Sequence, residues 1–310
     1  MTPALGAVIV NYNAGPELRR ALESIDRETG GSWQGVVVDN ASADGSEAAA
    51  MEFAQVRLVR NSENAGFARG VNQGIRECPA DRIVIMNPDC RLMPGSLPPL
   101  MAVLDSDPRC AIVAPLVRDP DGSPQGNARG DPDMLTGLFG RSSALRRTLP
   151  ALDVARRNVI VGTADDASTT VDWVSGACML VRRDAFVGVG GFDERYFMYW
   201  EDADLCRRLR AHGHTIRFAP AAAAVHRIGQ SSRTARTQSI RAFHDSAYLY
   251  YATHVAPGVL NPKRWIARAL LASRCWWKCA RTFPVRSMGT EGTEGTVSQE
   301  ERRNGDERSF

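Results

Sequence analysis

The sequence predicts an α/β protein with a Rossmann-like, mostly parallel sheet flanked by helices and a helical extension at its C-terminal end. Three observations predict this class. Short β-branched runs alternate with helical patterns over the first 118 residues. The runs are apolar at almost every position, as in parallel strands that are buried on both faces. Polar residues directly follow several runs, at the strand ends where such sheets bind ligands.

Five runs in the first half are expected to form strands of this sheet. They cover residues 7–10 (AVIV), 35–39 (GVVVD), 56–59 (VRLV), 82–87 (RIVIMN) and 110–117 (CAIVAPLV). Residues 119–132 are rich in Gly, Pro, Asp and Asn, which predicts a long loop at a seam between two halves. A second ordered block, from Val171 to His226, contains the helical pattern EDADLCRRLRAHG and then the strand TIRFAP.

Composition and charge exclude several classes of protein. A chain of 310 residues with 44% hydrophobic and 24% charged residues is neither wholly disordered nor a multi-span membrane protein. Its formal charge of +3 is too small to indicate nucleic-acid binding. The seven cysteines form no C-x-x-C pair, which argues against a disulfide framework or thiolate zinc site and favours a reducing cytoplasm. The first residues lack the basic region of an export signal, so export is not expected.

Two polar clusters follow expected strands in the first half. Asp39 ends the run GVVVD, where a carboxylate can contact a ligand or cap the next turn. Asn87-Pro88-Asp89 follows RIVIM, and Pro88 fixes the local backbone. A carboxylate there suits a divalent cation that is also bound by phosphate oxygens. The same three residues are equally good turn formers, so both interpretations stay open.

Two further candidates lie in the second block. Glu201 and Asp202 begin a helix, where acidic residues favour the helix dipole. The aromatic segment that precedes them, residues 195–200, would also give a partly desolvated pocket in which a carboxylate can act as a general base. His226 ends the expected short strand AAAAVH. A lone histidine is more often structural, but this one lies at a strand end, where it can contact a ligand.

Taken together, the motifs resemble those of family 2 glycosyltransferases, most closely the bacterial rhamnosyltransferase-like branch. The resemblance covers about residues 5–235 in one continuous order. Its motifs are VIVNYN, VVVDNAS, N-x-E-N-A-G-F-A-R-G-V-N-Q-G, IMNPDC, W-x-S-G-A, GGFDE, EDADLC and H-x-x-G-x-S. This resemblance implies a GT-A fold, an inverting transfer from a nucleotide-diphosphate sugar, and a divalent metal, Mg²⁺ or Mn²⁺, on the diphosphate.

The resemblance also implies a role for each matching residue. Asp202 matches the catalytic base, and Asp89 and His226 match metal-binding positions. The positions that match the donor site are Asn11, Asp39, Asn64, Gly66, Phe67, Asn72 and Asn87, the last as the first residue of the D-x-D position, and those near the acceptor are Trp173 and Glu201. The family's D-x-D acid pair is here Asn87-x-Asp89, a form common in this branch, so the metal site has one carboxylate fewer.

The same resemblance divides the chain by expected role. Residues 1–118 form the nucleotide-sugar half, residues 119–235 the acceptor and catalytic half, and residues 236–286 a helical extension. The branch favours dTDP-L-rhamnose as donor, with another deoxysugar, UDP-galactofuranose or a UDP-hexose as alternatives. The expected acceptor is a glycan or polyprenyl-linked glycolipid. The resemblance indicates least about which acceptor is used, because the family's Arg-Arg-Phe-Pro stretch is replaced here by residues 128–132 (ARGDP).

Two other function classes were weighed. A dinucleotide-dependent oxidoreductase should carry G-x-G-x-x-G after its first strand, whereas this chain has Asn11-Tyr12-Asn13-Ala14-Gly15. A non-catalytic sugar-nucleotide binder would have the donor-binding residues but would not need the catalytic ones. The presence of Asp202 and His226 together with Asp89 favours an enzyme over such a binder.

The C-terminal region has its own signal. No acidic residue occurs between Val255 and Thr290, and helical spacing places a tryptophan-rich side opposite a basic one. Charges interrupt the segment too often for it to span a bilayer. The pattern predicts an amphipathic helix on the anionic inner face of the cell membrane, or else one packed on the catalytic domain or a second subunit. Residues 287–310, with the repeat GTEGTEGT, are expected to be disordered.

Overall fold

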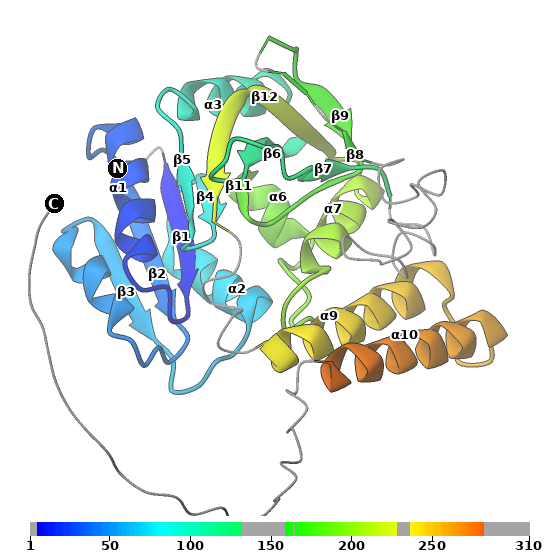
Figure 1. The fold of residues 1–310 in the computed structure, drawn as a ribbon. Coiled ribbons are helices and arrows are strands. Elements are labelled where there is room, and N and C mark those ends of the chain that lie inside the picture. The colour runs from blue at the N-terminus through cyan, green and yellow to red at the C-terminus, as the bar shows by residue number, and fades with distance from the viewer. Residues whose placement is uncertain (1–4, 132–158, 161, 164, 228–235, 282–310) are drawn as a thin grey trace, which may run out of the picture.

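The structure is a computed structural model that describes residues 5–131, 159–160, 162–163, 165–227 and 236–281. Within these ranges, nine strands form one mixed sheet with the order β3-β2-β1-β4-β11-β6-β12-β5 and with β9 paired to β12 (Figure 1). The strands are β1 (Gly6–Asn11), β2 (Gln34–Asp39), β3 (Val56–Arg60), β4 (Arg82–Met86), β5 (Cys90–Leu92), β6 (Cys110–Arg118), β9 (Thr169–Val171), β11 (Cys178–Arg182) and β12 (Thr215–His226).

The five strands expected in the first half are confirmed as β1, β2, β3, β4 and β6. The block β3-β2-β1-β4 is parallel, as its apolar runs predicted. Strand β11 then enters antiparallel between β4 and β6, and β12 lies parallel to β6. Because β11 and β12 belong to the second half of the chain, residues 1–118 and 119–235 build one sheet together.

Helices cover both faces of this sheet, so the fold is a three-layer sandwich. One apolar cluster packs α1 (Glu17–Thr29), the 3₁₀ helix η1 (Ser46–Glu52) and α3 (Leu97–Ser106) on one face. The other cluster packs α2 (Phe67–Glu77), α6 (Arg183–Gly188) and α7 (Glu201–Ala211) on the opposite face. The carboxyl ends of the parallel strands are left open for loops. A smaller sheet joins β7 (Ala128–Arg129) to β8 (Val159–Ile160) and β10 (Trp173–Val174).

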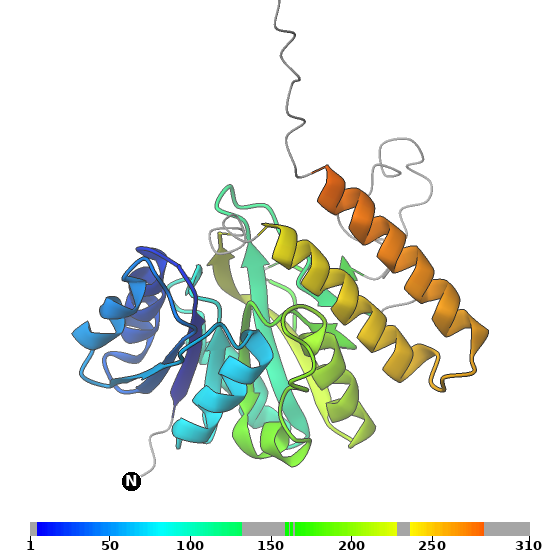
Figure 2. The same cartoon turned by 90° about the horizontal axis from the view of Figure 1, so that it is seen from below.

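The C-terminal extension forms a helical hairpin beside α7. It consists of α9 (Arg236–Tyr250), a π-helical turn η3 (Tyr251–Val255) and α10 (Pro262–Ala280). Figures 1 and 2 show α9 and α10 side by side, with α9 next to the sandwich and α10 outside it. Tyr250 of α9 is buried in a cluster with Tyr196 and Ala203, which attaches the hairpin to α7 and the loop before it.

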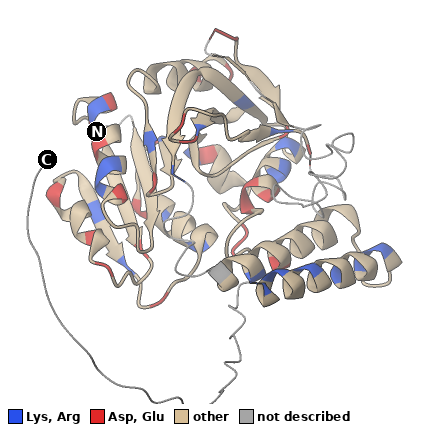
Figure 3. Ribbon diagram, viewed as in Figure 1, with Lys and Arg blue, Asp and Glu red and all other residues tan. Residues whose placement is uncertain are grey.

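The outward face of α10 carries the tryptophans. Ala267, Leu271 and Cys279 are buried, whereas Trp276 is 73% exposed. The other exposed apolar residues on α10 are Trp265, Ile266, Leu270 and Trp277. Lysines and arginines recur along the same helix (Figure 3). The alternative in which the tryptophan side packs on the catalytic domain is therefore wrong, because contact with α9 uses the other side of the helix. The expected disordered tail, residues 287–310, lies outside the described residues.

Candidate functional site

A polar cluster lies where β1 and β2 end side by side. The parallel register pairs Asn11 with Asp39. The Asn11 amide donates to Asp39 Oδ1 at 2.8 Å and to Ser46 Oγ at 2.8 Å, and the Ser42 hydroxyl donates to the same Asp39 oxygen at 2.6 Å. Asn11 Oδ1 is buried, and no hydrogen-bond partner for it is found in the described part of the chain. The cluster thus offers a rigid carboxylate and an unused amide oxygen. Sequence reasoning missed Ser42 and Ser46, although Ser42 belongs to the quoted VVVDNAS motif.

The segment Asn64–Phe67 touches the loop before α7. Asn64 Oδ1 accepts a hydrogen bond from Gly66 N at 3.0 Å, and Phe67 N donates to Phe197 O at 2.8 Å. Gly66 has φ of +86°, and a Cβ there would lie 2.4 Å from Phe197 O. Only glycine permits this close approach. The segment therefore connects the start of α2 to the loop that leads into α7.

Asn72 makes contacts of a different kind from those expected of a donor-site residue. Its amide nitrogen donates to Phe192 O at 2.8 Å, and its oxygen accepts from Phe192 N at 2.9 Å. The side chain is buried on α2 and its amide holds the turn at Gly191 and Phe192. Its geometry indicates a structural role.

The Asn87-x-Asp89 motif meets His226 because β5 pairs with the end of β12. The antiparallel register places His226 opposite Cys90, next to Asp89. His226 Nε2 lies 3.1 Å from Asp89 Oδ1 and 3.3 Å from Asn87 Nδ2. The side chains of His226 and Asp89 are only 12% and 9% exposed. Two distant motifs thus come together as a nitrogen and an oxygen ligand pair.

No larger metal-binding cluster accompanies this pair. Within the described ranges, no group of three or more His, Cys, Asp or Glu side chains is placed to hold a metal ion. Two protein ligands are nevertheless what a cation needs when phosphate oxygens and water complete its shell. The carboxylate of the pair suits Mg²⁺ or Mn²⁺, both of which prefer oxygen ligands.

Asp202 lies in the first turn of α7, held by backbone amides. Its Oδ2 accepts from Gly176 N at 3.0 Å and its Oδ1 from Ala203 N at 2.8 Å. Burial raises the pKa of Asp202, while these two amides and the nearby Arg129 guanidinium oppose that shift. A carboxylate held in this way is fixed in direction and more basic than one in water.

Glu201 differs from its neighbour in environment. It is 5% exposed, and its Oε2 has no hydrogen-bond partner among the described residues. Burial, and then the charge of Asp202, raise the pKa of Glu201 well above its usual range. When two adjacent carboxyl groups differ in burial and in the hydrogen bonds they accept, their pKa values separate, and one can be neutral while the other is ionised. Here burial favours the neutral form of Glu201 more strongly than that of Asp202, whose carboxylate is hydrogen-bonded by two backbone amides.

The loop before Glu201 is strained and is held by α9. Tyr199 and Trp200 have φ of +71° and +70°, a region that costs bulky residues about 1–3 kcal/mol each. Ser246 Oγ donates to Met198 O at 2.9 Å, and the Trp200 ring lies 5.2 Å from that of Tyr250. The C-terminal hairpin is therefore part of the support for the catalytic helix.

Contacts farther along α7 strengthen this support. Asp204, which is 1% exposed, accepts from Arg208 at 2.7 Å and lies 2.6 Å from His254 Nε2. Arg207 reaches the carbonyl of His254 at 3.3 Å. These bonds join α7 to the π-helical turn η3 and engage Asp204 away from Asp202.

Trp173 lies on β10 beside the catalytic helix. Its indole nitrogen donates to Gly130 O at 2.9 Å, and the Arg129 guanidinium lies 5.4 Å from the ring centroid. The β7–β10 register pairs the two residues directly. Arg129 was not among the residues predicted from the sequence to lie at the site. It lies in residues 128–132, the stretch that departs from the family pattern, and its positive charge was the signal that could have indicated it.

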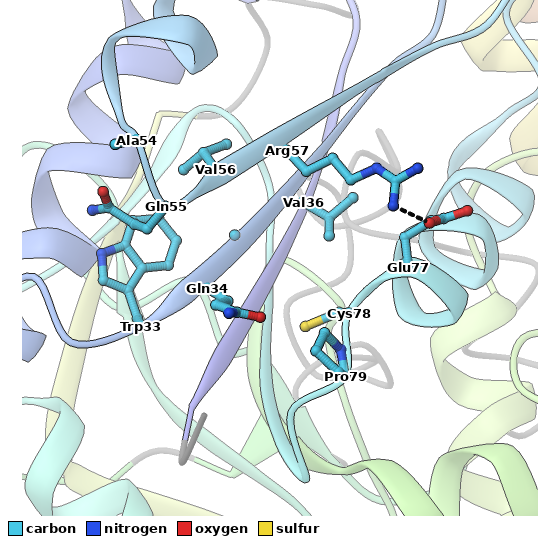
Figure 4. A pocket seen from close by; sticks show the side chains of 11 residues that line it. Trp33, Gln34, Val36, Ala54, Gln55, Val56, Arg57, Glu77, Cys78 and Pro79 are labelled. Atoms are coloured by element: carbon cyan, nitrogen blue, oxygen red, sulfur yellow. Dashed lines mark ion pairs between the residues drawn. The ribbon is translucent and has the colours of Figure 1, made fainter. Parts of the chain in front are cut away.

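A pocket on the other side of the molecule has no part in this site. Figure 4 shows it between the starts of β2 and β3, with Trp33 on one side and the ion pair of Arg57 and Glu77, 2.6 Å apart, on the other. Asp39 ends the strand that begins at Gln34, so the pocket and the polar cluster lie at opposite ends of β2.

The Asp202 carboxylate and the Asn87-x-Asp89 segment are both hydrogen-bonded to one dipeptide, Gly176–Ala177. Gly176 N donates to Asp202, and the carbonyl of the next residue, Ala177, accepts from Asn87 N at 2.9 Å. The base candidate and the Asp89–His226 pair therefore lie on one rigid framework.

Comparison with known proteins was made on this basis. The family model described as glycosyl transferase family 2 matches residues 7–187. The chain is 35% identical over 288 residues to the N-acetylglucosaminyl-diphospho-decaprenol L-rhamnosyltransferase of Mycobacterium tuberculosis, covering 88% of this chain and 92% of that protein. It is 26% identical to the dTDP-rhamnosyl transferase RfbF of Shigella flexneri, covering 75% and 72%.

A solved structure shows the same fold at low sequence identity. The mannosyltransferase PcManGT from Pyrobaculum calidifontis, in complex with GDP-Man and Mn²⁺, matches with a TM-score of 0.56 and 18% identity. The match covers 90% of this chain and 73% of that one. The predicted GT-A architecture is confirmed.

Proposed function

The chain belongs to glycosyl transferase family 2, and on that premise we propose that it transfers L-rhamnose from dTDP-L-rhamnose to a hydroxyl of a sugar carried on a polyprenyl diphosphate, with inversion. The observation that carries the chemistry is the Gly176–Ala177 dipeptide, which fixes Asp202 relative to Asn87 and the Asp89–His226 pair. A base and a diphosphate site held in one frame are what a single-displacement transfer requires.

The sugar and acceptor are supported by the relatives. The mycobacterial relative is named for L-rhamnosyl transfer and for a decaprenyl-diphosphate-linked acceptor, and it aligns over most of both chains. RfbF is named for a dTDP-linked rhamnose donor. Such an acceptor implies work at the inner face of the cell membrane, in the synthesis of a cell-surface polysaccharide.

In the proposed mechanism, the acceptor hydroxyl approaches Asp202, which removes its proton as the oxygen attacks the anomeric carbon. The bond from that carbon to the diphosphate oxygen breaks on the opposite face, and dTDP leaves. One base is sufficient for a single displacement with inversion. Asn11 and Asp39 bind the nucleoside, and the rigid Ser42–Ser46 cluster keeps them in place. Trp173 and the neutral Glu201 contact the acceptor sugar. Glu201 Oε2, which has no described partner, is available for a substrate hydroxyl.

Asp89 and His226 are the residues that would hold a divalent cation, which as a Lewis acid stabilises the charge that develops on the departing diphosphate. The fit rests on their convergence and burial, with Asn87 beside them. The Mn²⁺ in the mannosyltransferase of the same fold supports this assignment.

A donor panel tests the proposed function. The purified protein with Mg²⁺ or Mn²⁺ is expected to release nucleoside diphosphate from dTDP-L-rhamnose faster than from UDP-galactofuranose or a UDP-hexose, and to show its largest thermal shift with dTDP-L-rhamnose. Faster turnover of a UDP-sugar would assign the enzyme to another branch of the family. If the protein binds sugar nucleotides but turns none of them over, even when an acceptor is present, it is a non-catalytic binder.

We further propose that α10 attaches the enzyme to an anionic membrane surface. None of the helices that the structure describes is long and apolar enough to cross a membrane. The outward face of α10 instead carries Trp265 and Trp276, and the helix also has the exposed cations Lys263 and Arg268, of which Arg268 lies 5.3 Å from the centroid of the Tyr248 ring of α9. Indole rings suit the headgroup region, and each cation near an anionic surface contributes about 1 kcal/mol. Attachment would bring the site to a lipid-linked acceptor.

Removal of the tryptophan face is expected to abolish membrane binding. Full-length protein should co-sediment with anionic vesicles, and 0.5–1 M salt should weaken this because the Debye length falls to about 3 Å at 1 M. The variant Trp265→Ser/Trp276→Ser and truncation after Pro262 should remain in solution. The matched control Met51→Ser/Met93→Ser removes two exposed apolar side chains elsewhere and should still bind.

Equal sedimentation of the tryptophan variant and the full-length protein would contradict membrane attachment through α10. If that variant instead changes a full-length dimer into a monomer, the exposed face is a subunit interface.

A further inference from the structure

The segment after β6 folds back against the end of β12. Asp119 and Ser123 close a turn by a backbone bond of 2.8 Å, and Gln125 N then donates to Val117 O at 2.9 Å. Strand β12 runs parallel to β6 here, with Val225 opposite Arg118. The backbone of Gln125 is therefore fixed beside His226, although the composition of residues 119–132 predicted only a long loop.

The side chain of Gln125 has one defined orientation. Its Nε2 donates to His226 O at 2.7 Å and to Asp119 Oδ1 at 2.7 Å. Both partners are oxygen acceptors, so the amide nitrogen must face them. The amide oxygen, Oε1, consequently lies 3.0 Å from His226 Nδ1.

This orientation decides which ring nitrogen of His226 carries the hydrogen. An amide oxygen can only accept, so Nδ1 must be the donor. The other nitrogen, Nε2, then presents a lone pair, and it lies 3.1 Å from Asp89 Oδ1. Two electron pairs at that separation repel each other unless a positive charge lies between them. A cation shared by His226 Nε2 and Asp89 would supply that positive charge.

We infer that Gln125 is a positioning residue that sets the tautomer and direction of His226 for a divalent cation. The inference rests on the proposed metal site and adds to it a residue that the family motifs do not include. Outer-sphere partners of this kind typically change metal affinity by about 10–100-fold.

The test compares Mn²⁺ affinity in full-length variants. Mn²⁺ is titrated into protein saturated with dTDP, and free Mn²⁺ is followed by electron paramagnetic resonance. Gln125→Ala is expected to weaken binding about 10–100-fold. His226→Ala should weaken it at least as much. Gln34→Ala removes an exposed glutamine at the far end of β2 and should bind as the unsubstituted protein does.

A second readout reports the tautomer itself. Long-range ¹H–¹⁵N spectra of the histidine rings should show His226 with its hydrogen on Nδ1 in the unsubstituted protein, and a shift toward Nε2 in Gln125→Ala. The signal is assigned by its loss in His226→Ala.

The outcomes separate the inference from the proposed function. If His226→Ala weakens Mn²⁺ binding and Gln125→Ala does not, or if His226 carries its hydrogen on Nε2, the role of Gln125 is wrong while the metal site stands. If His226→Ala binds Mn²⁺ normally, the metal site and the inference both fail.

Discussion

Replacing Asp202 with Asn is expected to lower kcat by about 10²–10⁴-fold, the usual contribution of a general base. The amide is nearly isosteric with the carboxylate but cannot accept the acceptor's proton. Donor binding should change little, because Asp202 is held by Gly176 and Ala203 and not by the nucleotide cluster. Initial rates of nucleoside diphosphate release with acceptor, together with a donor Kd, measure both expectations.

Glu201→Gln is the matched control for this prediction. Burial and the neighbouring charge raise the pKa of Glu201, which favours the neutral form that an amide imitates. This variant should keep far more activity than Asp202→Asn. Near-normal turnover by Asp202→Asn, or a greater loss of activity in Glu201→Gln than in Asp202→Asn, would show that Asp202 is not the general base.

Removal of the cation is expected to have an effect of similar size. A Lewis acid contributes several kcal/mol to stabilising a leaving diphosphate, and each 1.4 kcal/mol is about tenfold in rate. EDTA should therefore lower activity by about 10²-fold or more, and Mn²⁺ or Mg²⁺ should restore it. Asp89→Ala and His226→Ala should each weaken metal-dependent donor binding, because the two side chains share one cation.

Asp81→Ala serves as the control, since that carboxylate is exposed at the start of β4, far from the carboxyl ends of the strands. Unchanged activity of the unsubstituted enzyme in EDTA would remove the metal from the mechanism.

The sequence predicted best those features that depend on local pattern. The apolar runs of β1, β2, β3, β4 and β6 have strand periodicity of their own, and the acidic start of α7 follows from helix spacing. The meeting of Asn11 and Asp39 also follows, because neighbouring parallel strands end together.

Non-local pairing could not be predicted in the same way. The insertion of β11 between β4 and β6, and the register that brings His226 to Asp89, depend on tertiary contacts between segments far apart in the chain. The expected pair TIRFAP and AAAAVH is one strand, β12, with an irregularity between Ala219 and Ala223. Composition alone could not show that Gln125, in a stretch of turn-forming residues, is aimed at His226.

For α10, helical periodicity predicted two faces but not which one would be covered. That choice depends on tertiary contacts: Ala267 is buried in a cluster with Tyr251 and Ala256, Leu271 is buried as well, and the tryptophans stay exposed. Side chains on the covered side include the half-buried Arg274 and Lys278, whose long aliphatic parts can pack while their charges reach water.

The central claim is an inverting L-rhamnosyl transfer to a polyprenyl-diphosphate-linked sugar. The most direct test incubates the full-length enzyme and a divalent metal with dTDP-L-rhamnose and a short-chain polyprenyl-diphospho-N-acetylglucosamine, followed by mass spectrometry and ¹H NMR of the product. The expected product carries one added deoxyhexose with an anomeric configuration opposite to that of the donor. A retained configuration, or no product from this pair where a different nucleotide sugar is transferred, would contradict it.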